Sequence, residues 1–111
     1  MALQEKQLGQ LRPANTTAAS VYSPGAGVTA VIKGIFIANT TGATVNFRLF
    51  VDDDGSTYDE STALYWDASV PANSTVEITA FIAMNDSGGN IAVRTDTASA
   101  LTFTVFGAEI E

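Results

Sequence analysis

The fold class is decided by residues 45–51, which read Val-Asn-Phe-Arg-Leu-Phe-Val. Apolar side chains occupy every odd position, and polar side chains occupy the even positions except at Phe50. Successive side chains of a β-strand point to opposite faces, so this alternation predicts a strand with one buried and one exposed face.

Turn clusters rich in Pro, Gly, Asn and Asp break the chain on both sides of this strand, a pattern typical of an all-β domain. We predict one antiparallel β-sandwich over residues 14–111, of Greek-key or jelly-roll type, with about seven strands. The strand over residues 28–38 is apolar on both parities, so we expect both of its faces to be covered. The expected strands lie near residues 16–23, 28–38, 45–51, 62–69, 75–82, 91–96 and 101–106.

Residues 1–13 are expected to form an extended N-terminal arm, because they are too few for an independent helix. Leu3, Leu8 and Leu11 lie among polar residues there. Two interpretations stay open, an arm that docks its leucines onto a neighbour and a frayed terminus. The first ten residues have no continuous apolar segment before a cleavage site, so we expect no secretory signal.

Composition narrows the classes of partner. The chain has 111 residues, a size typical of one domain, with a net charge of −7 and only five basic residues. Such an acidic chain repels phosphate, so neither nucleic acid nor an anionic membrane surface is an expected partner. Cysteine is absent from the sequence, and stability must therefore come from packing without disulfides.

The sequence lacks histidine as well as cysteine, which excludes Ser-His-Asp and Cys-His nucleophiles and the usual zinc sites. A pair of carboxylates could still hydrolyse a glycoside, but a sandwich of this length leaves little room for the deep cleft required. We therefore expect a protein that is not an enzyme and needs no cofactor.

Four Asn-X-Ser/Thr triplets begin at Asn15, Asn39, Asn73 and Asn85. In a secreted eukaryotic protein they would be glycan acceptors. Without a secretory signal we interpret them as turns, in which Asn side chains bond to their own backbone.

Residues 52–60, Asp-Asp-Asp-Gly-Ser-Thr-Tyr-Asp-Glu, raise a calcium hypothesis with Asp52, Asp54 and Asp59 as the candidate ligands. The EF-hand pattern does not fit, because aligning its glycine with Gly55 puts Ser61 where a bidentate carboxylate belongs. A long turn with solvated acidic side chains is the favoured interpretation.

Phe50, Phe81 and Phe106 each fall on the otherwise polar parity of their strands. Exposed together, they would form an apolar surface that marks contact with another subunit. The alternative is that a bulge turns them into the core, or that a loop covers them.

Tyr58, Tyr65 and Trp66 lie near the acidic segment and could form a platform for sugar rings, with Tyr58 and Trp66 as the candidate contacts. Tyr65 and Trp66 are adjacent on a predicted strand, so they point to opposite faces and at most one lies in the core.

Three stretches of the chain carry a resemblance to a known class of proteins. They are residues 8–13, Leu-Gly-Gln-Leu-Arg-Pro, residues 31–41, Val-Ile-Lys-Gly-Ile-Phe-Ile-Ala-Asn-Thr-Thr, and residues 102–107, Thr-Phe-Thr-Val-Phe-Gly. The chain resembles small virion structural proteins of tailed bacteriophages over nearly its whole length. The resemblance implies a β-sandwich that decorates or cements a capsid shell, or lies in a neck, tail or fibre. It also implies a homo-oligomer, with a trimer favoured, in the virion beside partners such as a major capsid protein.

The first hypothesis is accordingly a capsid decoration or cement subunit, with a neck, tail or fibre component as its alternative. It would assemble through Leu3, Leu8 and Leu11 and through the three outward phenylalanines. The second hypothesis is a carbohydrate-binding or adhesion module that uses the exposed aromatic side chains and the acidic loop.

Overall fold

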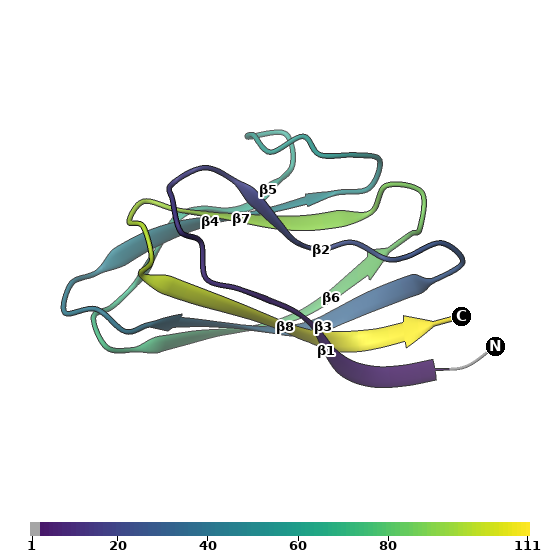
Figure 1. The fold of residues 1–111 in the computed structure, drawn as a ribbon, viewed down its shortest axis with the longest axis horizontal. Coiled ribbons are helices and arrows are strands. Elements are labelled where there is room, and N and C mark those ends of the chain that lie inside the picture. The colour runs from purple at the N-terminus through teal and green to yellow at the C-terminus, as the bar shows by residue number, and fades with distance from the viewer. Residues whose placement is uncertain (1–2) are drawn as a thin grey trace.

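The computed structural model describes residues 3–111 and consists of two four-stranded antiparallel sheets packed face to face (Figure 1). The predicted β-sandwich is confirmed, with eight strands in place of about seven. The first sheet has the order β1-β8-β3-β6 and the second the order β2-β7-β4-β5. The strands are β1 (Leu3–Leu11), β2 (Ala19–Tyr22), β3 (Thr29–Asn39), β4 (Val45–Asp52), β5 (Ala63–Val70), β6 (Thr75–Met84), β7 (Asn90–Thr95) and β8 (Leu101–Ile110).

The core lies between the sheets and is made by the alternating residues that the sequence predicts. In β4 the side chains of Val45, Phe47 and Leu49 are buried, and Asn46 and Arg48 between them are half-buried. The Phe47 ring meets the ring of Phe103 on β8 edge to face, with 5.9 Å between centroids, and so links the two sheets. Residues 3–111 contain no helix that is long and apolar enough to cross a membrane.

Strand β3 corrects one expectation about burial. Its register against both neighbours shifts between Ile32 and Gly34, which marks a β-bulge. The bulge switches the inward parity, so that Ile32 faces the core before it and Ile35 after it, whereas Phe36 is exposed. The strand is apolar on both parities because the phase changes, and only one of its faces is covered by the second sheet.

The segment expected to be a separate arm is, over its described part, the edge strand β1, and residues 1–2 lie outside the described residues. Strand β1 pairs antiparallel with β8 from Leu3 to Leu11, a contact far along the chain that local pattern does not reveal. Leu8 and Leu11 pack against the core of their own domain. Leu3 is 64% exposed, so only this leucine is available to a neighbour.

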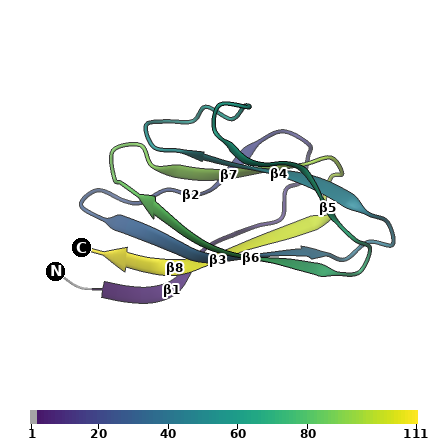
Figure 2. The same ribbon diagram turned by 180° about the vertical axis from the view of Figure 1, so that it is seen from behind.

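Strands β1 and β2 are the edges of the two sheets on the side of the sandwich that faces the viewer in Figure 1. A Cβ atom on Gly9 would lie 2.6 Å from the carbonyl oxygen of Val21, so glycine permits this close approach of the sheets. The Tyr22 hydroxyl donates to Glu109 at 2.6 Å, and Lys6 forms an ion pair with the same carboxylate at 2.8 Å. Figure 2 shows the opposite side, where β5 and β6 are the edges.

Asn39 ends β3 as a buried amide, 2% exposed, that joins the loop after β3 to the end of β5 and the loop that follows it. Its Nδ2 donates to the carbonyl oxygens of Ala43, Val70 and Pro71 at 2.9–3.2 Å. Its Oδ1 accepts from the backbone N–H of Thr41 at 2.9 Å. Every polar atom of this side chain therefore has a partner, as burial requires.

The interpretation of the Asn-X-Ser/Thr triplets as turns is confirmed at three of the four positions. At each of the three, the Asn side-chain oxygen accepts a hydrogen bond from the backbone N–H two residues later. Asn15 accepts from the N–H of Thr17 at 3.0 Å, and Asn85 accepts from the N–H of Ser87 at 2.7 Å. Asn39 and Thr41 form the third such turn. Asn73 takes a positive φ of 55°, which asparagine tolerates better than most residues.

Replacing Asn39 by alanine is expected to lower the free energy of unfolding by about 2–3 kcal/mol, because buried carbonyl groups lose their donor. Urea unfolding followed by tryptophan fluorescence measures this change. Asn15→Ala, at an exposed turn, is the matched control, with an expected loss below about 1 kcal/mol. Equal effects of the two substitutions would contradict the structural role of Asn39.

The ion pair and hydrogen bond to Glu109 predict a pH dependence. Lys6 and then Tyr22 lower the pKa of Glu109 below its ordinary value of 4.5, so the ionised group stabilises the fold above that pH. The contribution is lost as the pH falls through the lowered pKa. Glu109→Gln should therefore reduce stability at pH 7 and make little difference at low pH, where wild type is protonated. Urea midpoints at both pH values test this, with Glu111→Gln as the control.

Candidate interaction surface

The outer face of the first sheet carries an aromatic pair, Phe36 on β3 and Phe106 on β8. The two rings meet edge to face with 5.7 Å between centroids, and each side chain is 38% exposed. The bulge before Gly34 places Phe36 on this face, and Phe106 pairs with Gly34 across the strands. The alternation along β8 predicts that Phe106 points outward, whereas the outward position of Phe36 depends on the bulge, for which Gly34 inside the strand is the signal in the sequence.

Polar side chains surround the aromatic pair. Gln7, Gln10 and Thr104 line a shallow hollow of about 330 Å³ beside the two rings. The Gln10 amide donates to the Thr104 hydroxyl at 3.0 Å. A mixed surface of exposed rings and hydrogen-bonding side chains is typical of contacts between proteins.

A second hollow, of about 290 Å³, continues from the first past Phe106 and is lined by charged side chains of β1 and β3. Lys33 reaches over β8 to Glu5, with 2.9 Å between Nζ and Oε2, and this contact lowers the pKa of Glu5. Gly107, which pairs with both Ile32 and Lys6, lies on the strand between them. This exposed ion pair contributes little to stability but sets the charge pattern at the edge of the surface.

Phe81 on β6 is the most exposed large apolar side chain that the structure describes, at 79%. Its neighbours on the same face of the strand, Thr79 and Ala83, are exposed as well. The expectation that Phe81 points outward agrees with this geometry, and the ring lies at the free edge of the first sheet.

Phe50 corrects the expectation of three exposed phenylalanines, because it is only 2% exposed. The ring lies outside the core cluster and is covered on the outer face of the second sheet by Tyr58 and Trp66, at 6.0 and 6.3 Å between centroids. The cause is the long loop after β4, which folds back over this face. A covering loop was the alternative that the sequence left open.

Trp66 and Tyr65 point to opposite sides of β5, as their adjacency predicts. The Tyr65 ring contacts Phe47 of the core at 5.9 Å between centroids, whereas Trp66 contacts Phe50 on the outer face. The Arg48 guanidinium lies 3.6 Å from the centre of the Trp66 ring and is held there by two hydrogen bonds to Asp67. One face of the indole is therefore occupied by a cation, which reduces the area available for stacking on a sugar.

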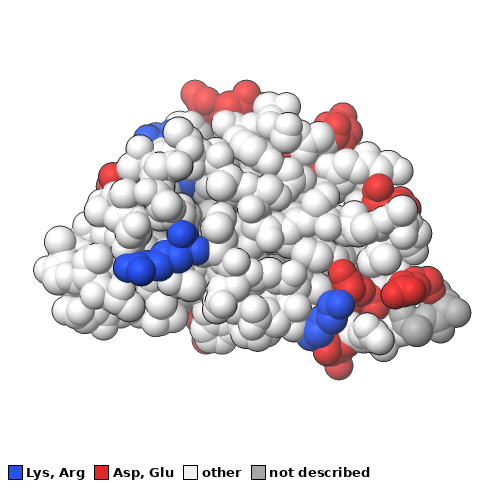
Figure 3. Space-filling view, in the orientation of Figure 1, with Lys and Arg blue, Asp and Glu red and all other residues white. Residues whose placement is uncertain are grey.

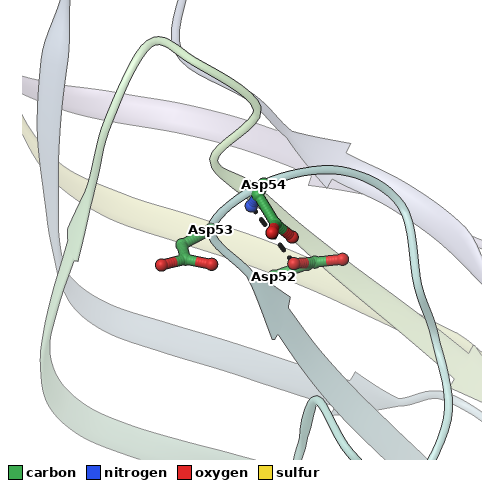
Figure 4. A group of neighbouring side chains, drawn as sticks. All are labelled: Asp52, Asp53 and Asp54. Carbon is green, nitrogen blue, oxygen red and sulfur yellow. Dashed lines mark hydrogen bonds between the residues drawn. The ribbon is translucent and has the colours of Figure 1, made fainter.

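The three adjacent carboxylates of Asp52, Asp53 and Asp54 lie within 4.8 Å of one another (Figure 4). Asp52 is buried and accepts from the N–H groups of Thr57 at 2.9 Å and Asp54 at 3.2 Å, which lower the pKa of Asp52. The Asp52 carboxylate in turn raises the pKa of Asp54. Asp59, the third candidate calcium ligand, is outside this group and accepts from Ser61, as in a turn.

Residues 52–60, the acidic loop, are held in place by contacts with the turn between β6 and β7. Asn85 donates to the Asp53 carbonyl oxygen at 3.0 Å, and the N–H of Gly55 donates to Gly88 at the same distance. Gly88 has a φ of 111°, and a Cβ atom there would lie 2.9 Å from the backbone of Asp54. In Figure 3, acidic side chains gather at the rim of the view and uncharged atoms cover most of the face.

No protein-family profile and no curated protein sequence matches the chain. Among solved structures, a chain in the structure of infectious bursal disease virus, Gx strain, is similar with a TM-score of 0.52 and 13% identity. The likeness covers 97% of this chain and 32% of the viral chain. The Drosophila NLP core, whose structure was described for pentamer formation and histone binding, has a TM-score of 0.48 at 12% identity, with 98% of both chains covered. Likeness at such identity shows the fold alone.

Replacing aspartate by asparagine is expected to change stability in opposite directions at Asp54 and Asp52 of the acidic loop. Asp54→Asn should raise stability near neutral pH, because the raised pKa of Asp54 means that the folded state disfavours its charge. Asp52→Asn should lower stability, because the backbone N–H groups that it accepts from favour the charged form. Thermal unfolding in a buffer with chelator measures both, and a change of the same sign in the two variants would contradict this account of the loop.

Proposed function

We propose that the protein is a non-enzymatic structural subunit of a virus particle, and specifically a capsid decoration or cement subunit of a tailed bacteriophage. The observation that carries the proposal is the outer face of the first sheet, where Phe36, Phe81 and Phe106 are exposed together with amide side chains. Burial of such rings stabilises an interface by roughly 1.5–3 kcal/mol each. A protein partner that covers this face is the simplest reason for three exposed rings.

The topology supports the same proposal. The chain crosses between the sheets so that the orders are β1-β8-β3-β6 and β2-β7-β4-β5. We infer from these orders an eight-stranded jelly roll made of two Greek keys, an architecture that builds viral capsid domains among others. The likeness to a chain of a virus structure agrees with this inference at the level of the fold.

Size also favours assembly through the first sheet. Strands of nine to eleven residues span about 30–35 Å, and four of them are about 19 Å wide. The outer face therefore offers roughly 600 Å², close to the ~800 Å² that each partner buries in a standard interface. In the proposed assembly this face contacts the capsid shell or a neighbouring copy, and Leu3 at the start of β1 extends the apolar contact.

The particle itself tests the proposal. Quantitative mass spectrometry of purified particles of the encoding virus should find the chain in a fixed ratio to the major capsid protein, whereas its absence would contradict the proposal. A variant with Phe36→Thr and Phe106→Thr should fold, since threonine suits exposed strand positions, and should fail to bind particles that lack the wild-type protein. The matched control Thr97→Ser, in an exposed loop, should bind as wild type does.

A further inference from the structure

The four edge strands of the sandwich differ in how they are protected from pairing with other strands. Strand β2 has only four residues, β1 has a charged pair and a bulge between Gln7 and Gly9, and β5 has register shifts and a positive φ at Asp67. Short length, charge and bulges are the usual devices that prevent edge pairing. Strand β6 differs in its length and low charge, with ten residues, one charged side chain and neither proline nor glycine. Its register shift against β3 falls at Ala80 and Phe81 and leaves the alternation of inward and outward side chains along β6 unchanged.

The uncharged part of β6 is its second half, residues 78–84, which read Ile-Thr-Ala-Phe-Ile-Ala-Met. A run of this length with high strand propensity and no charge is typical of segments that pair with other strands. Among the described strands β6 pairs with β3 alone, so its other edge offers free backbone groups. Phe81, at 79% exposed, projects beside that edge.

We propose that β6 pairs antiparallel with β6 of a second copy across a two-fold axis, which joins the two first sheets into one eight-stranded sheet. The pairing goes beyond the proposed function, because it applies to any assembly of the chain and needs no virus particle. An isologous contact of this kind closes on itself and leaves no further edge of the same kind exposed.

The register follows from the pleat. Directly opposite residues of an antiparallel pair lie on the same face, so outward residues of one copy must face outward residues of the other. With the ends of β6 overlapped as fully as this allows, the two-fold axis passes through Thr79 or through Ala80. In both registers Phe81 lies opposite or diagonal to Thr79 of the second copy, which covers part of the exposed ring.

The distribution of charge favours a second copy of the chain as the partner of the β6 edge. The chain has a net charge of −7, so most of its surface repels another copy, but Glu77 is the only charged residue of β6. In the two registers the Glu77 side chains of the copies lie four or six positions apart, about 13–20 Å. That separation exceeds the Debye length of about 8 Å at physiological ionic strength. The β6 edge is therefore a place where two acidic copies can meet without strong repulsion.

Lysine and glutamate at Thr79 test the pairing. Thr79 is exposed, and in both registers the two copies of this residue are opposite or diagonal neighbours. Thr79→Lys and Thr79→Glu should each weaken self-association about tenfold or more in sedimentation velocity over the micromolar range expected of one strand edge. An equimolar mixture of the two variants should restore association as a heterodimer. Gln4→Lys, on the other edge of the same sheet, is the control and should associate as wild type does.

Circular dichroism and melting temperatures of both variants establish that each one folds. A wild-type chain that stays monomeric throughout, or variants that associate like wild type, would overturn the pairing. Association that is abolished in each variant and not restored in the mixture would also overturn it, because a different partner surface would then be at work. Presence of the chain in particles together with any of these results leaves the proposed function standing and removes only the β6 contact.

Discussion

The structure depends on one constraint, that a two-layer sandwich has a single interior and each strand can give it only every second side chain. In β3 the buried apolar residues change from even to odd positions after Ile32. The bulge before Gly34 shifts the alternation by one residue at the same point, so that Ile35 and Ile37 also point into the core. Phe47 and Phe103 then fill the space between the sheets. Any aromatic side chain on the other parity lies outside this interior, so it is either covered by another part of the chain or exposed.

The four outward phenylalanines differ in how far the chain itself covers them. Phe50 is covered within its own chain by the loop after β4, which is held by hydrogen bonds to the turn between β6 and β7. Phe36 and Phe106 cover each other in part. Phe81 is left exposed on an edge strand that has only one charged side chain, Glu77. Exposure therefore rises from Phe50, which is buried, to Phe81, whose ring is available to another protein chain.

The sequence is enough to predict seven of the strands, the alternation in β4 and the Asn turns, because these depend on neighbours along the chain. It is not enough to predict β1, whose polar pattern becomes a strand only through its pairing with β8 and the close approach that Gly9 permits. The burial of Phe50 was equally hidden, since it depends on where a distant loop returns. For the candidate surface, parity identifies Phe81 and Phe106, but Phe36 requires knowledge of the bulge.

Hydrogen exchange of the β6 amides at low and high protein concentration tests most directly whether another chain covers this surface. The account predicts that amide groups of residues 78–84 exchange more slowly as concentration rises, whereas those of the edge strand β2 do not change. Exchange in β6 that is independent of concentration, and unaltered in purified particles, would contradict the account.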